Sequence, residues 1–197
     1  KYPEGFSMND FRAMNAKDEN PYSAAYYTIR SIRENEIDVW FVLHDHPGPL
    51  AIWAEEAKVN SEVAIWGPRT TFTPPLDTNN YIFIADETAQ PAALASIENL
   101  NKKENFICLF ETQNETTKFE YDDPDHRIEW IYRNDQPAGE GTELLERIKQ
   151  LNVNSEKLYV FGAGEARQIS TIRKTLKKNL NLKVDQMSFT GYWRKTS

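Results

Sequence analysis

Two apolar runs, each followed at once by a turn and a helix, constrain the fold of this chain most. The first covers residues 81–85 and leads into a polar turn at 86–89; the second covers 158–161 and leads into a glycine-containing turn at 162–164. Such a continuous apolar run is typical of a strand that is buried on both faces. The alternation of strand and helix predicts a mostly parallel sheet with right-handed crossovers. Ligands of such sheets bind at the carboxyl ends of the strands, so both turns are candidate binding sites.

The remaining elements place these runs in the second of two parts. The first part is rich in strands with one short helix. A connection rich in Thr, Pro and Asn at 70–80 predicts the boundary, with one domain over 1–73 and another over 74–197. Residues 1–22 read as polar and irregular. We predict further strands at 24–30, 37–44, 62–66, 106–110, 128–132 and 184–193, and helices at 50–57, 88–100, 144–151 and over the apolar positions 169, 172 and 176.

The charge of the chain is unevenly distributed. Its net charge is −7, but residues 167–197 carry eight Lys or Arg and one acid, a local +7, which leaves −14 on the other 166 residues. An acidic body argues against a nucleic-acid partner, because such binding depends on neutralising phosphates. A basic end on an acidic body suits a compact anion. The alternative for the four cations Arg173, Lys174, Lys177 and Lys178 is a solvated helix face, whose late position favours cations.

The composition of the chain bears on membrane association and on the cellular compartment. No apolar run approaches the ~20 residues that span a bilayer, so we predict no membrane partner. The one cysteine, Cys108, has no partner for an internal disulfide, which favours a reducing compartment, the cytoplasm. It lies in an apolar strand and reads as a small buried residue rather than a nucleophile.

Two segments of the first part are candidate cofactor sites. In the strand around Tyr27, Thr28 and Arg30 an aromatic ring, a hydroxyl and a cation follow one another; an aromatic core strand is the plainer interpretation. After His44, the Gly48-Pro49 turn starts a helix whose N–H groups could hold a pyrophosphate. A metal site at His44-Asp45-His46 is not predicted, because alternating neighbours do not converge on one ion and no third ligand is evident.

The two turns of the second part have a different character. Thr88 is predicted to cap a helix after Asp86 and Glu87, a geometry that attracts phosphates although the carboxylates oppose them. Gly162 and Gly164 permit close approach of a ligand to the backbone. Because no nucleophile elbow and no catalytic triad is present, no catalytic side chain is predicted and a cofactor is expected to carry the chemistry.

Taken in order, these motifs resemble those of the siderophore-interacting proteins, flavin-dependent ferric-siderophore reductases of the ferredoxin–NADP reductase superfamily. The resemblance runs from about residue 26 to residue 194. The matching residues are Tyr27-Thr28-Ile29-Arg30, His44, Gly48-Pro49, Trp53-Ala54, Gly67-Pro68-Arg69, Asp86-Glu87-Thr88-Ala89, Pro91-Ala92, Glu129-Trp130, Arg133, Gly164-Glu165-Ala166 and Gly191-Tyr192-Trp193-Arg194.

The resemblance implies an α+β fold in two parts: an antiparallel FAD-binding β-barrel, then an α/β domain like NAD(P)-binding domains, with a parallel sheet. It also implies a role for each matched residue. FAD would contact Tyr27, Thr28, Arg30, His44, Gly48, Pro49, Ala51, Trp53 and Trp193. The reductant, NAD(P)H or ferredoxin, would be bound by Asp86, Glu87, Thr88, Ala89, Gly162, Gly164 and Glu165.

The chain departs from the family pattern in three respects. Ala25 stands where an arginine is usual, and Ala51 where Ser or Thr is usual. The opening strands of the barrel are missing, so the barrel is expected to be incomplete at its N-terminus. Either the chain is trimmed or partial, or FAD is held loosely.

We therefore predict a reductase that passes electrons through FAD to a ferric siderophore. Arg194 and Lys195 are expected to dock the anionic chelate, with Lys183 and Arg30 as weaker candidates. Two alternatives stay open: a flavin-free siderophore-binding or iron-handling protein, and a reductase for another acceptor such as a quinone or dye. The choice among NADH, NADPH and ferredoxin also stays open.

Overall fold

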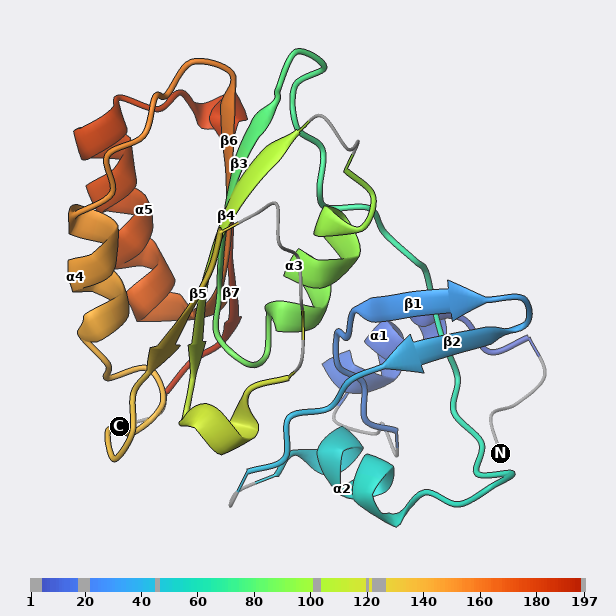
Figure 1. Ribbon diagram of the computed structural model, residues 1–197. Helices are drawn as coiled ribbons and strands as arrows, with labels where there is room; N and C mark the ends of the chain where they lie inside the picture. The colour runs from blue at the N-terminus through green and yellow to red at the C-terminus, as the bar shows by residue number, and fades with distance from the viewer. Residues whose placement is uncertain are drawn as a thin grey trace. The chain divides into compact units, whose positions relative to one another are not determined.

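The computed structural model describes residues 5–17, 22–44, 47–100, 104–119, 121 and 127–195 (Figure 1). The chain divides into two units. The first comprises residues 1–27 and 40–70, and the second comprises residues 28–39 and 71–197. The segment 28–39, which lies within the predicted first domain, thus belongs to the second unit.

A five-stranded parallel sheet forms the centre of the second unit. Its strands are β3 (Asn80–Ala85), β4 (Asn105–Thr112), β5 (Arg127–Tyr132), β6 (Leu158–Glu165) and β7 (Met187–Trp193). They lie in the order β5-β4-β3-β6-β7, and every neighbouring pair is parallel. The predicted parallel sheet is therefore confirmed. The direction of winding reverses between β3 and β6, which is the position where ligands of open α/β sheets bind.

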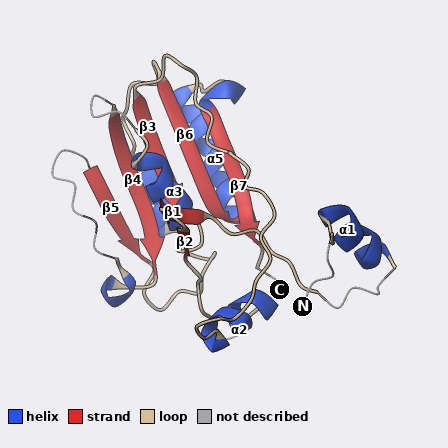
Figure 2. Cartoon of the chain, turned by 90° about the vertical axis from the view of Figure 1, so that its right-hand side faces the viewer, coloured by secondary structure: helices blue, strands red, loops and turns tan. Residues whose placement is uncertain are grey.

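Helices cover both faces of this sheet, as Figures 1 and 2 show. Helix α3 (Gln90–Ile97) packs on the face that receives Tyr81 and Phe83. Helices α4 (Glu143–Lys149) and α5 (Ala166–Leu180) lie on the face that receives Ile82 and Ile84. Side chains alternate between faces along a strand, so each buried strand supplies both cores. This double coverage explains why the strands read as continuous apolar runs.

The antiparallel part is a two-stranded ribbon. Strands β1 (Ile29–Arg33) and β2 (Glu36–Val39) pair with each other, and β1 lies beside α3. Arg30 of β1 donates two hydrogen bonds to Glu98 at the end of α3, at 2.7 and 2.6 Å. Among the described residues no third strand joins the ribbon, so it does not close into a barrel.

Two predicted strands form only in part, since of 24–30 and 37–44 only residues 29–30 and 37–39 lie in strands, and one predicted strand does not form. Residues 62–66 have no strand hydrogen bonds, and Val63 and Ile65 are exposed. A strand needs a neighbour that pairs with its backbone groups, and the described chain supplies none here. The sequence of 62–66 therefore predicted a strand that lacks a pairing partner among the described residues.

The described residues of the first unit form two helices. Helix α1 (Met8–Ala16) starts at a capping box in which Ser7 and Asp10 bond each other's backbone N–H groups. The prediction of irregular structure over residues 1–22 was wrong at this helix. Helix α2 (Pro49–Glu56) lies close to its predicted position. Among the described residues of this unit, Phe11 and Ala51 are the buried apolar side chains.

The last two strands also differ from the prediction. Strand β6 continues to Glu165, so Gly162 and Gly164 lie inside a strand rather than in a turn. The reason is that β7 pairs with β6 from Val160 onward and extends the ladder. No helix among the described residues has the length and apolar character that a bilayer crossing requires.

Candidate functional site

Three buried carboxylates lie at the carboxyl edge of the parallel sheet. Asp86 follows β3, Glu111 lies near the end of β4, and Glu165 ends β6; their exposed fractions are 5%, 1% and 1%. Acidic side chains are almost never buried to this degree unless they are paired or hydrogen-bonded. Each of the three therefore needs polar partners, and these partners define the site.

Asp86 is held by Thr88 of its own turn and by Trp193 of β7. The indole Nε1 of Trp193 donates to Asp86 Oδ2 at 2.8 Å, and the N–H and hydroxyl of Thr88 donate to Oδ1 at 2.9 and 2.5 Å. Gly164 makes room for the carboxylate, since a Cβ there would lie 2.6 Å from Oδ2. Burial raises the pKa of Asp86 although the bonds from Thr88 and Trp193 oppose the shift.

Glu165 caps helix α5. Its Oε2 accepts hydrogen bonds from the N–H groups of Arg167 and Gln168 at 2.7 and 2.8 Å, and its Oε1 accepts one from the Lys195 N–H at 3.3 Å. A carboxylate at a helix N-terminus is favoured by the helix dipole. These N–H groups of α5 are therefore occupied by the protein itself.

Glu111 is fixed by two glutamines. Gln168 Nε2 donates to Glu111 Oε2 and to the Gly141 carbonyl, both at 3.2 Å, and Gln90 Nε2 donates to the Glu111 carbonyl at 2.9 Å. Burial raises the pKa of Glu111 to about 7. Sequence reasoning did not single out Glu111; a charged residue ending the apolar strand after Phe110 was the available signal.

The predicted capping role of Thr88 was wrong. Helix α3 begins at Gln90 after Ala89, and no side chain caps it. The Asp86 carboxylate lies two residues before Thr88 and takes both its N–H and its hydroxyl. The adjacent Glu87 forms an ion pair with Arg133, with Oε1 2.6 Å from Nη1.

The residues predicted to bind a reductant largely meet at this edge. Asp86, Thr88, Gly164 and Glu165 share it through the contacts described above. The space beside each of the two glycines is occupied by another side chain of the protein. A Cβ on Gly162 would lie 2.4 Å from the Phe189 ring, and the Asp86 carboxylate lies beside Gly164. Reductant binding by these residues stays a prediction.

The residues predicted to bind FAD are divided between the units. Thr28, Arg30 and Trp193 belong to the second unit, and the others belong to the first. Tyr192 forms a hydrogen bond with Thr28, and burial raises the pKa of Tyr192. The Arg30 guanidinium is already paired with Glu98 inside its unit, and its side chain is 14% exposed.

In the first unit the predicted FAD residues gather around helix α2. Gly48 caps α2 without any side-chain hydrogen bond, Pro49 occupies its first turn, and a Cβ on Gly48 would meet nothing within 4 Å. The ring of Phe41 lies between Tyr27 and Trp53, with centroid distances of 4.4 and 6.4 Å. His44 is exposed. The Ala51 N–H donates to the Gly48 carbonyl, which leaves the Leu50 N–H of this turn; with open space around Gly48 and no capping side chain, these residues are compatible with the pyrophosphate of FAD.

The three cations predicted to dock a chelate are not all together. Arg194 is exposed and follows β7, and Lys195 next to it places Nζ 2.5 Å from Glu140 Oε1. Lys183 is exposed and precedes β7 at its other end. The seven residues of β7 separate the two positions by about 20 Å at the usual rise of a strand.

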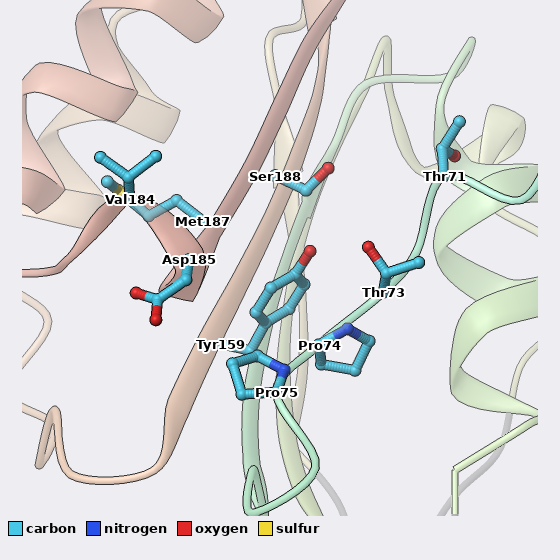
Figure 3. Close-up of a pocket in the computed structure, with 9 residues that line it drawn as sticks. All are labelled: Thr71, Thr73, Pro74, Pro75, Tyr159, Val184, Asp185, Met187 and Ser188. Atoms are coloured by element: carbon cyan, nitrogen blue, oxygen red, sulfur yellow. The ribbon is translucent and has the colours of Figure 1, made fainter.

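A depression of about 510 Å³ lies near the amino ends of β6 and β7, away from the carboxylates (Figure 3). None of its lining residues was predicted as a site residue. In the described ranges, no group of three or more His, Cys, Asp or Glu side chains is arranged to hold a metal ion. The depression is lined by Thr71, Thr73, Pro74, Pro75, Tyr159, Val184, Asp185, Met187 and Ser188.

Comparison with known families gives two matches that together cover most of the chain. Residues 78–196 match the family described as siderophore-interacting protein, and residues 2–72 match the siderophore-interacting FAD-binding domain. The first match alone covers more than half of the chain.

Individual relatives agree with these matches. The ferric vibriobactin reductase ViuB of Vibrio cholerae is 28% identical over 176 residues, which are 86% of this chain and 64% of the relative. A siderophore utilization protein from T. fusca superposes with a TM-score of 0.77 at 31% identity, over 87% of this chain and 66% of that one. A ferredoxin-NADP+ reductase mutant from Plasmodium falciparum shares the fold, with a TM-score of 0.69 at 16% identity over 84% and 76% of the two chains. This chain thus spans somewhat less than two thirds of the length of the vibriobactin reductase.

Proposed function

This chain belongs to the siderophore-interacting protein family, and from that premise we propose that it takes part in the flavin-dependent reduction of ferric siderophores. The relative named as a ferric vibriobactin reductase supports this substrate class. Ferric iron is bound tightly by hard oxygen ligands, and ferrous iron is bound by them more weakly. Transfer of one electron to the ferric ion therefore releases the metal from the chelate.

The observation that carries the proposal is the open N-terminus of α2. Gly48 offers no capping side chain, and Pro49 lacks an N–H that would need one. The Ala51 N–H already donates to the Gly48 carbonyl at 3.0 Å, so the Leu50 N–H is the group of this turn left for an anion, and no residue among 47–53 is acidic. When bound, FAD would accept electrons from a reductant and pass them to the ferric ion.

The chain's own residues would then position the reaction partners. Tyr27 would contact the flavin ring, and Gly48, Pro49 and Ala51 would hold the pyrophosphate. NAD(P)H or ferredoxin would supply the electrons at the edge formed by Asp86, Thr88, Gly164 and Glu165. Arg194, Lys195 and Lys183 would attract the anionic chelate.

The test starts with FAD binding and not with turnover. Purified protein is titrated with FAD, and quenching of the flavin fluorescence reports binding; FMN serves as the control ligand because it lacks the pyrophosphate-linked adenosine. The loaded protein is then reduced with dithionite under argon and mixed with a ferric tris-catecholate. Tighter binding of FAD than of FMN, followed by return of the oxidised flavin spectrum on mixing, is the expected result. Absence of FAD binding would overturn the proposal.

One specific observation favours a second candidate, a siderophore-binding protein that holds no flavin. Arg30 is paired with Glu98, and Ala51 carries no hydroxyl, so two groups that could bind the cofactor are engaged or missing. In that case the ferric chelate binds to the protein in the absence of FAD. The ferric charge-transfer band of the bound chelate persists as long as no reduced flavin is added.

A further inference from the structure

Helix α5 has a basic outer face that pairs with nothing else in the described structure. Its sequence carries five cations and no acid: Arg167, Arg173, Lys174, Lys177 and Lys178. All five are exposed, whereas Ile169, Ile172 and Leu176 on the opposite side are buried against the sheet. At the 100° spacing of a helix, Arg167, Lys174 and Lys178 form a stripe directly opposite this buried side.

Six other cations of the second unit are paired, whereas Lys118, Lys157, Lys183 and Arg194 form no ion pair with a described residue. Arg33, Arg133, Arg147, Lys149 and Lys195 each form an ion pair with a carboxylate, as does Arg30. None of the five on α5 forms an ion pair with any described residue. We call this set the basic face of α5.

Helix stability does not account for the basic face. Lys177 and Lys178 lie in the last turn, where cations suit the helix dipole, but Arg167 lies in the first turn, where a cation is disfavoured. The pairs Arg173–Lys177 and Lys174–Lys178 are like charges four residues apart, an arrangement that destabilises a helix by about 0.2–0.5 kcal/mol each. The protein thus keeps a charge pattern that weakens this helix.

We propose that the basic face of α5 docks a small acidic electron-carrier protein that supplies the electrons. This inference rests on the proposed function, which requires an external reductant. Helix α5 begins at Ala166, directly after Glu165 at the carboxyl edge of the sheet. A protein bound along the helix, which is about 22 Å long, therefore reaches the edge where Asp86 and Trp193 lie.

The occupation of the edge favours a protein over a dinucleotide as the donor. The N–H groups of Thr88, Arg167 and Gln168 already bond the carboxylates of Asp86 and Glu165. A pyrophosphate would have to displace these buried acids to use the same donors. A protein carrier needs no phosphate site and binds through charge complementarity at a surface.

The charge of the whole chain argues against the other polyanions. Nucleic acids and anionic membranes present negative charge over an area much larger than one helix face. The remainder of the chain carries −14 outside residues 167–197 and would oppose such an extended partner. A compact acidic protein can meet the basic face of α5 without approaching the acidic body.

The test uses an acidic [2Fe–2S] ferredoxin as the probe. Its binding to the FAD-supplemented protein is measured by calorimetry at low and high salt for the wild type and for Lys174→Glu/Lys178→Glu. Lys17→Glu/Lys58→Glu in the first unit is the matched control, because it changes the net charge equally at exposed positions. Circular dichroism and urea unfolding verify that each variant is folded.

We expect the α5 variant to bind ferredoxin at least about tenfold more weakly, with a reduced salt dependence, and the control to bind like the wild type. Dithionite-driven reduction of ferric chelate stays unchanged in both variants, because it bypasses the carrier. Equal weakening in both variants, or binding of DNA or phosphatidylserine vesicles through α5 in place of ferredoxin, would overturn the docking proposal. Failure of the dithionite reaction in the wild type would instead overturn the proposed reductase function.

Discussion

The N-termini of helices α2 and α5 differ in capping: a side chain caps α5, and none caps α2. At α2 the cap is Gly48, no side chain bonds the first turn, and space is open around it. At α5 the cap is Glu165, whose buried carboxylate takes two N–H groups. An open N-terminus retains its capacity to bind an anion, whereas a capped one contributes its capacity to the fold. The same local geometry therefore points to a ligand in one unit and to internal stability in the other.

The largest effect is expected from adding a methyl group at Gly164, the residue before the Glu165 cap of α5. In Gly164→Ala the new Cβ would lie 2.6 Å from Asp86 Oδ2, at a backbone φ of +150° that side chains rarely adopt. We expect a loss of about 3 kcal/mol in the free energy of unfolding, measured by urea denaturation. Gly48→Ala is the control, because it has open space and a φ of −72°, and it should change the value by less than about 0.5 kcal/mol. Equal losses in both variants would contradict the contrast.

The buried acid of β4 gives the next effect. Because the pKa of Glu111 is raised from 4.5 to about 7, the folded protein holds its proton more tightly than the unfolded chain does. The resulting stability is fully present below pH 4.5 and is lost as the pH rises toward 7. Glu111→Gln imitates the protonated form. Over this pH range the free energy of unfolding of the variant should therefore fall by on the order of 3 kcal/mol less than that of the wild type. Parallel pH profiles for the two proteins would show that Glu111 does not titrate differently in the fold.

A capping carboxylate can be introduced at the open helix. In Gly48→Asp the new side chain would bond the first turn of α2 and place negative charge where the pyrophosphate is proposed to bind. We expect at least about tenfold weaker FAD binding, or 1.4 kcal/mol, by fluorescence titration. The free protein should become slightly more stable, because aspartate is a good cap. Unchanged FAD affinity would remove α2 from the cofactor site.

The converse change opens the capped helix. In Glu165→Ala the N–H groups of Arg167 and Gln168 lose their acceptor, and we expect the free energy of unfolding to fall by about 1 kcal/mol. Glu143→Ala is a suitable control, since it removes an acid from the first turn of α4, where no side-chain cap is present. A loss no greater than that of the control would mean that the Glu165 cap contributes nothing to stability.

Much of the second unit was predictable because its strands are buried on both faces. The apolar runs at 81–85 and 158–161 and the helical spacing of Ile169, Ile172 and Leu176 identified elements that the structure confirms. The first unit was less predictable. The Ser7–Asp10 capping box was the local signal of α1, while residues 62–66 lack the neighbour that would make them a strand.

By itself, the sequence determined the family, the two-part α+β organisation and the parallel sheet, because motif order and apolar periodicity are properties of the chain alone. The candidate site depended on tertiary structure. Trp193 reaches Asp86 across 107 positions, Gln168 reaches Glu111 across 57, and Phe189 fills the space beside Gly162. These contacts arise only where β3, β4, β6 and β7 end at one edge of the sheet. The caps themselves are local, since Glu165 and Gly48 adjoin the helices that they start, but which buried side chains meet at the edge follows from the packing of distant segments.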